Sequence, residues 1–253
     1  MGALDPTSWI FSSLLLSLRV SPAFALAPPF SLTGVPRLFR ALFGLGISAA
    51  LAGADPGARI TDFSAAFLIV GSVRELALGL ISVLALQLMF GALNVAGRTL
   101  DIQAGFGLGA AIDPSTGAQT PLIGSALTYE AGAVFFALGG AEDLLRILQA
   151  SLQAVPLGAG HFPAALAPLT EFVSAVFVTA LGVAGGAILC LFLADLAIAL
   201  LSRTVPQMNV LILGLQVKSL VILIALPATL GFSGVLLARL ASFTLASIPR
   251  LIA

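Results

Sequence analysis

The chain has 253 residues, of which 59% are hydrophobic and 9% are charged, whereas an ordinary globular domain is about 25% charged. Eleven basic residues balance eleven acidic ones, which argues against nucleic acid as a partner, because proteins that bind it carry a basic footprint. One cysteine and one histidine leave no internal disulfide and no cluster of ligands for a metal ion. We therefore expect an all-α membrane-type protein that is not an enzyme and has no catalytic, cofactor-binding or metal-binding residues.

Six apolar stretches predict the helices, because about 20 apolar residues cross the hydrocarbon core of a bilayer. They are residues 9–27, 36–54, 76–97, 122–141, 172–194 and 219–238. The third, fifth and sixth contain no charged side chain, and the others are shorter or interrupted. The sequence thus predicts about six hydrophobic helices or helix pairs, several of them broken by proline or glycine.

The first three helices have recognisable start and stop signals. The first is expected over Thr7–Ala25, before Pro28-Pro29, and we expect it to be retained because a secretory signal would carry basic residues first. The second begins near Pro36, a favourable residue in a first helical turn, and ends at the turn residues Gly53–Gly57. The third is unusually long and extends to about Leu100.

The last three helices follow a glycine-rich connection. Pro121 opens the fourth helix, and the fifth covers about residues 170–201. The sixth begins near Asn209, and Pro227 and Gly231 should bend or break it.

The connection between the third and fourth helices, at residues 97–117, differs from the apolar sequence around it. It contains closely spaced glycines, an Asp-Pro pair and a Ser-Thr-Gly turn. Backbone that leaves a helix at membrane depth must be buried in protein or line a cavity, so this segment is the first candidate for a gate or binding site. The Gly-x-Gly-x-Gly spacing, with no strand before it, does not match a nucleotide-binding loop.

Two interpretations of this segment stay open: an ordinary connector, and a plug that closes a pore by excluding water. In a plug, glycines would allow a tight chain path, apolar side chains would seal, and an Asp-Pro turn would fix the geometry. The candidate plug residues are Gly105, Phe106, Gly107, Leu108, Gly109, Ile112, Asp113 and Pro114.

Six charged residues lie in or beside the apolar stretches, where a charge costs several kcal/mol unless it faces protein or water. They are Arg19, Arg74, Glu75, Glu130, Asp195 and Lys218. Three interpretations compete: a proton or ion relay through the carboxylates, structural pairs within this chain or with another, and long side chains that reach the membrane surface. Adjacent Arg74 and Glu75 cannot pair on one helical face, which favours burial against other subunits.

The residues Ala96–Gly107, followed by Asp113-Pro114 and Gly117, resemble the signature region of the FliR family of flagellar biosynthetic proteins. That family includes the SctT proteins of virulence type III secretion. The segments Leu18-Arg19-Val20, Val35-Pro36-Arg37 and Ser202–Gly214 with Lys218 fit the same family. One departure is Leu215-Gln216-Val217, where the family usually has a proline before the basic position.

This resemblance implies a subunit of the type III secretion export gate, in the bacterial inner membrane at the flagellar basal body. Its partners would be FliP-type and FliQ-type subunits, FlhB-type and FlhA-type export proteins, and unfolded export substrates. The chain would form a single domain over residues 1–253, with about 1–168 similar to a P-type subunit and about 169–253 similar to a Q-type hairpin. The loop Gln103–Thr120 would contribute to the plug, and the gate would sit out of the usual bilayer plane.

Two other classes remain as alternatives. A secondary transporter of a small solute would place its site at the broken segment 103–120. An intramembrane enzyme would need a nucleophile with a base, or paired carboxylates, and no such set stands out.

Overall fold

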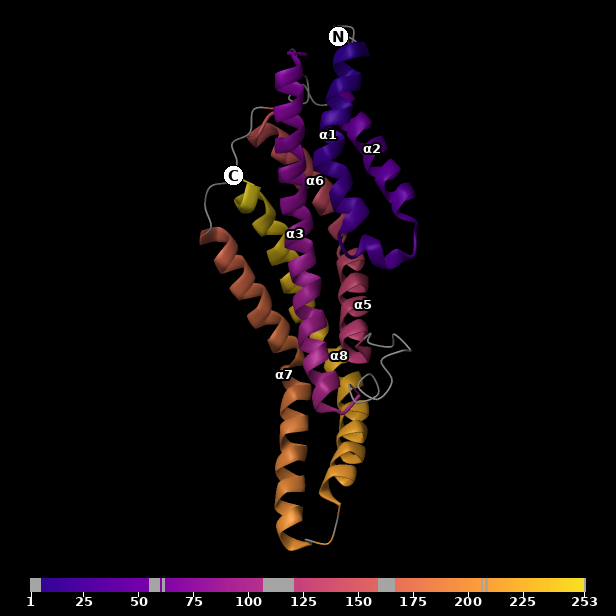
Figure 1. Cartoon of the computed structure of the whole chain (residues 1–253), viewed down its shortest axis with the longest axis vertical. Coiled ribbons are helices and arrows are strands. Elements are labelled where there is room, and N and C mark those ends of the chain that lie inside the picture. The colour runs from indigo at the N-terminus through magenta and orange to yellow at the C-terminus, as the bar shows by residue number, and fades with distance from the viewer. Residues whose placement is uncertain are drawn as a thin grey trace. The chain divides into compact units, whose positions relative to one another are not determined.

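The computed structural model describes residues 6–54, 60, 62–106, 121–158, 167–205, 207 and 209–252. In this part of the chain every regular element is helical, which confirms the all-α prediction (Figure 1). The elements are α1 (Pro6–Leu26), the 3₁₀ helix η1 (Phe30–Thr33), α2 (Arg37–Ala54), α3 (Ala65–Gln103), α5 (Leu122–Ala137), α6 (Gly140–Ala154), α7 (Ala167–Thr204) and α8 (Val210–Ile252).

Five of these helices are long and apolar enough to cross a membrane: α1, α2, α3, α7 and α8. A sixth span is available if α5 and α6, which meet at an angle of 68°, count as one broken segment. The prediction of about six hydrophobic helices or helix pairs is therefore confirmed, and the chain is a multi-pass membrane protein.

Two details differ from the sequence prediction. The fourth predicted apolar stretch ends at residue 141, yet α6 follows as an amphipathic helix that buries Leu144, Leu148 and Leu152. It begins after Gly139, whose φ is +75°. The sixth helix is not broken at Pro227 and Gly231, because α8 continues through both residues for 43 residues, and a bend at these positions stays a prediction. Proline removes one backbone donor, and in apolar surroundings the other helical hydrogen bonds have no water to replace them.

The chain divides into two compact units. The first comprises Met1–Leu88, Phe135–Val173 and Ser242–Ala253, and the second comprises Met89–Val134 and Ser174–Ala241. Helices α3, α5, α7 and α8 each contribute residues to both units.

In the first unit, α1 is the central element. It buries Leu16, Val20 and Phe24, and small residues let its neighbours approach closely. A Cβ placed on Gly79 of α3 would lie 2.6 Å from the carbonyl oxygen of Leu18, and one on Gly44 of α2 would lie 2.6 Å from the Cα of Ser21. Backbone contact therefore fixes α2 and α3 against α1.

In the second unit, α3 and α5 pack closely at one end, and α7 and α8 run side by side as an antiparallel hairpin (Figure 1). Its core consists of apolar side chains from all four helices. These include Met89, Phe90, Leu93, Ile123, Leu127, Ala184, Leu191, Ile222 and Leu237.

Candidate functional site

The neck is the contact, within the second unit, between the end of α3, the start of α5 and one face of α8. It is formed by Gly97, Asp101, Ala104, Gly105, Ile123, Gly124, Leu215 and Ser219. It brackets the candidate plug segment, because the chain leaves the neck after Phe106 and re-enters it at Pro121.

Asp101, a residue that is 4% exposed, joins α3 to α5 in the neck through its carboxylate. Its Oδ1 and Oδ2 accept hydrogen bonds from the backbone N–H of Ile123 at 3.0 and 3.1 Å, and Oδ2 accepts a third from the N–H of Gly124 at 3.3 Å. These donors belong to the first turn of α5, where N–H groups have no partner within the helix. Asp101 therefore caps a helix 22 residues further along the chain, and the helix dipole stabilises its charge.

Glycine at two positions lets the helices of the neck meet. A Cβ on Gly97 would lie 2.3 Å from the Cα of Gly124, and a Cβ on Gly124 would lie 2.9 Å from the carbonyl oxygen of Asn94. Any side chain larger than hydrogen at Gly97 would push α5 away, so this contact depends on glycine.

The end of α3 is closed by a Schellman motif. The N–H of Phe106 donates to the carbonyl of Asp101 at 2.9 Å, and the N–H of Gly105 donates to the carbonyl of Ile102 at 3.1 Å. Gly105 has a φ of +88°, which a residue with a side chain rarely adopts. A side chain there would also meet Leu215 of α8, since a Cβ would lie 2.7 Å from a Leu215 Cδ atom.

Of the eight candidate plug residues, Gly105 and Phe106 belong to the described chain. The remaining six, Gly107, Leu108, Gly109, Ile112, Asp113 and Pro114, lie outside the described residues. The structure therefore shows how both ends of the segment are held and leaves the plug a prediction.

Two charged residues of the first unit, Arg19 and Glu75, form a buried arginine network with Ser151, Val155 and Gly158. Arg19 is 0% exposed and Glu75 is 1% exposed. The pair is bidentate, with Nε to Oε2 at 2.6 Å and Nη2 to Oε1 at 3.0 Å. Nη1 donates to the carbonyl and hydroxyl oxygens of Ser151, and Nη2 donates to the carbonyl of Val155. All five guanidinium donors are thereby used.

Gly158 completes the buried arginine network, because it contacts both charged neighbours on α3. Its N–H donates to Oε1 of Glu75 at 3.1 Å, and its carbonyl accepts a hydrogen bond from Nη1 of Arg74 at 3.1 Å. Adjacent Arg74 and Glu75 thus find their partners within this chain, on one glycine whose φ is +74°.

Two polar contacts involve the charges of the second unit. The Ser233 hydroxyl, 2% exposed, donates to Oε1 of Glu130 at 2.5 Å, while Oε2 of Glu130 has no hydrogen-bond partner among the described residues. Lys218 on α8 pairs with Asp195 on α7 at 2.5 Å, where both side chains are partly exposed.

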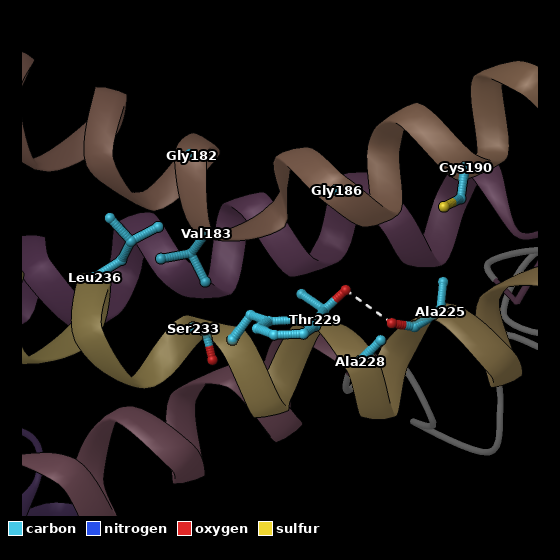
Figure 2. Close-up of a pocket in the computed structure, with 10 residues that line it drawn as sticks. Gly182, Val183, Gly186, Cys190, Ala225, Ala228, Thr229, Ser233 and Leu236 are labelled. Atoms are coloured by element: carbon cyan, nitrogen blue, oxygen red, sulfur yellow. Dashed lines mark hydrogen bonds between the residues drawn. The ribbon is translucent and has the colours of Figure 1, made fainter.

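A groove of about 270 Å³ lies between α7 and α8 in the second unit (Figure 2). Its residues are mostly small: Gly182, Val183, Gly186, Cys190, Ala225, Ala228, Thr229, Phe232, Ser233 and Leu236. A Cβ on Gly182 or Gly186 would meet no atom of the described residues within 4 Å. The Gly-x-x-x-Gly spacing of these two glycines suits a close helix–helix contact, and no described helix of this chain makes that contact.

Sequence reasoning missed several residues of these sites. Asp101, Ser151, Gly158 and Ser233 bind their charged or backbone partners across 22 to 132 positions of sequence. One signal was present for Asp101, which stands near the end of a long helix beside a glycine-rich connection.

The chain matches the family model described as bacterial export proteins, family 1, over residues 10–243. It is 29% identical to the flagellar biosynthetic protein FliR of Bacillus subtilis, over 95% of this chain and 94% of that protein. It is 32% identical to the surface presentation of antigens protein SpaR of Salmonella typhimurium, over 83% of this chain and 79% of that protein. It is 31% identical to the Yop proteins translocation protein T of Yersinia pestis, over 58% of this chain and 57% of that protein.

Proposed function

Because this chain belongs to the bacterial export proteins of family 1, we propose that it is a subunit of a type III secretion export gate, which helps form and close the channel for unfolded export substrates. The family match carries the proposal, since it spans residues 10–243 and so includes the neck and the buried arginine network. The relatives include flagellar proteins and a Yop translocation protein, so the exporting system is of the flagellar or the virulence type.

The neck supports a role for the segment 107–120 in closing the channel. A plug has to be anchored at both ends so that its middle can move without separating the helices that carry it. Asp101 binds the start of α5, and Ser219 of α8 donates to the carbonyl of Ala104 at 3.2 Å. In this proposal Phe106, Leu108 and Ile112 seal the pore by excluding water.

The groove between α7 and α8 supports assembly with other gate subunits. Its open glycines, Gly182 and Gly186, would let an apolar helix of a FliP-type or FliQ-type neighbour approach closely. We propose the same inner-membrane assembly as the site of contact with FlhB-type and FlhA-type export proteins. The expected division near residue 168, with a Q-type hairpin after it, belongs to this proposal; α7 and α8 are the two helices of that hairpin.

Secretion by a strain that lacks the gene tests the proposal. We expect loss of hook and filament proteins from the medium, or of virulence effectors in the other type of system, with recovery when the intact gene is supplied. As a control, the deletion strain is supplied with the Arg146→Gln gene. We expect this variant to restore secretion like the intact gene, because Arg146 lies on the surface in an exposed pair with Glu142. Normal secretion of both substrate classes would contradict the proposal.

The plug is tested separately by membrane conductance. Residues 106–112 are replaced by a Gly-Ser linker of equal length, which keeps the neck and removes the sealing side chains. We expect a leak of ions in the resting cell. Unchanged conductance would overturn the plug and leave the export-gate assignment to the secretion experiment.

A further inference from the structure

A second cavity lies in the first unit, where the end of α1, η1 and the start of α2 meet. Its volume is about 320 Å³, within the range of small-molecule sites. It is lined by Phe24, Phe30, Val35, Phe39, Arg40 and Phe43. Four of these six residues are phenylalanines, with the rings of Phe24 and Phe30 at 4.8 Å and those of Phe24 and Phe43 at 5.8 Å. The walls of the cavity are therefore almost entirely aromatic.

Among the described residues that line this cavity, Arg40 is the one that carries a charge. Its Nε donates to the carbonyl of Val35 at 3.1 Å, while its Nη1 is buried and has no acceptor among the described residues. In the described chain no carboxylate forms an ion pair with Arg40. A buried guanidinium N–H without an acceptor is unfavourable, so the cavity favours an anionic group at this position.

The surroundings of Arg40 limit what kind of anion fits. Arg37 is exposed one turn earlier, so two positive charges stand at the first residues of an apolar helix. Further along the same helix, Leu38, Phe39, Leu42 and Phe43 are 52–67% exposed. Positive charge at the end of a membrane helix, beside an apolar face, is where anionic lipid headgroups gather.

We propose that this cavity binds one anionic phospholipid, with its phosphate on the free guanidinium N–H of Arg40 and an acyl chain against Phe24, Phe39 and Phe43. A phospholipid carries both groups that the cavity calls for: its phosphate matches the charge of Arg40, and its acyl chain matches the aromatic wall. The inference rests on the membrane location of the chain and not on the export gate, so each can fail without the other.

The full-length chain, purified in mild detergent, is titrated with long-chain phosphatidylglycerol and with phosphatidylcholine, and bound lipid is counted by native mass spectrometry. One interfacial arginine contributes about 1 kcal/mol to the binding of anionic lipid, so Arg40→Gln should weaken phosphatidylglycerol binding about fivefold. Arg146→Gln, which removes the same charge from an exposed site on α6, should leave it unchanged. Glycerol phosphate, which has no acyl chain, should not compete.

A thermal melt shows whether Arg40→Gln is folded. If it is not, Arg40→Lys, which keeps the positive charge, is used as the second variant. It should weaken phosphatidylglycerol binding less than Arg40→Gln does. Equal binding of both lipids, or equal phosphatidylglycerol binding by wild type and Arg40→Gln, would overturn the proposal. So would a purified gate assembly in which Arg40→Gln releases a neighbouring subunit and bound lipid is unchanged, because the cavity would then hold an acidic side chain of that neighbour.

Discussion

Removing one partner of the Arg19–Glu75 pair should destabilise the protein far more than removing both. In Glu75→Ala, the Nε of Arg19 and one hydrogen on Nη2 lose their acceptors in a site that is 0% exposed. Breaking a buried ion pair in this way costs about 3–5 kcal/mol. Arg19→Met should cost a similar amount, because it leaves the Glu75 carboxylate with the N–H of Gly158 as its one hydrogen bond among the described residues.

The double variant Arg19→Met/Glu75→Leu removes both charges and keeps apolar volume. Replacement of a buried ion pair by packed apolar residues is often nearly neutral, so we expect this variant to regain most of the loss. It leaves the carbonyls of Ser151 and Val155 without Arg19, and we therefore expect a remaining deficit of about 1–3 kcal/mol.

Thermal unfolding in detergent measures these differences, with the fluorescence of Trp9 as the signal. Trp9 is the single tryptophan of the chain, and it stands on α1, the helix that carries Arg19, with its indole N–H bonded to the carbonyl of Ala49 on α2. For a chain of this size, 1 kcal/mol moves the midpoint by about 2–4 °C, so each single variant should lose about 6–20 °C. If the double variant loses the sum of the two single losses, the pair is not coupled and the reasoning is refuted.

Three further predictions concern the second unit. Asp101→Ala should lower stability by about 1 kcal/mol, as loss of a helix cap does, and should raise resting membrane conductance. Asp101→Asn should be intermediate, because its amide oxygen still accepts a hydrogen bond. Unchanged melting and conductance would contradict the capping role. Gly97→Ala should cost about 1–3 kcal/mol of stability or more, because its Cβ would overlap the backbone of Gly124. Gly91→Ala on the same helix, where a Cβ meets no described atom within 4 Å, should be neutral or stabilising by up to about 1 kcal/mol, and equal melting of the two variants would refute the contact. Gly186→Leu should leave the melting temperature of the isolated chain within about 2 °C and abolish co-purification of partner subunits, and full co-purification would show that the groove is not their binding surface.

The helices could be predicted because their signal is local. Long uncharged stretches such as residues 172–194 leave the backbone no choice but to satisfy its hydrogen bonds within a helix. The helix α6 was missed because Glu142, Asp143 and Arg146 interrupt the apolar stretch. The spacing of Leu144, Leu148 and Leu152 would have identified one buried face.

The sites could be predicted only in part, because their contacts connect distant positions. The sequence identifies Arg19 and Glu75 as charges in need of partners. They stand 56 positions apart in the chain, however, and only the packing of α1 on α3 brings them together. The role of Asp101 is harder still to predict from the sequence. A carboxylate at the end of a helix commonly faces water, and its role as the cap of α5 depends on the backbone contact of Gly97 with Gly124.

Because of the neck, the packing of the helices does not depend on the length of the segment 107–120. Asp101 and Ile123 are joined by hydrogen bonds, so the closure of the intervening chain is already fixed by the helices. Doubling a flexible loop adds only about 0.6 kcal/mol of closure entropy. The stability of the helices therefore depends little on how many residues lie between these two anchors, so the length of this segment can vary during evolution while the helices stay the same.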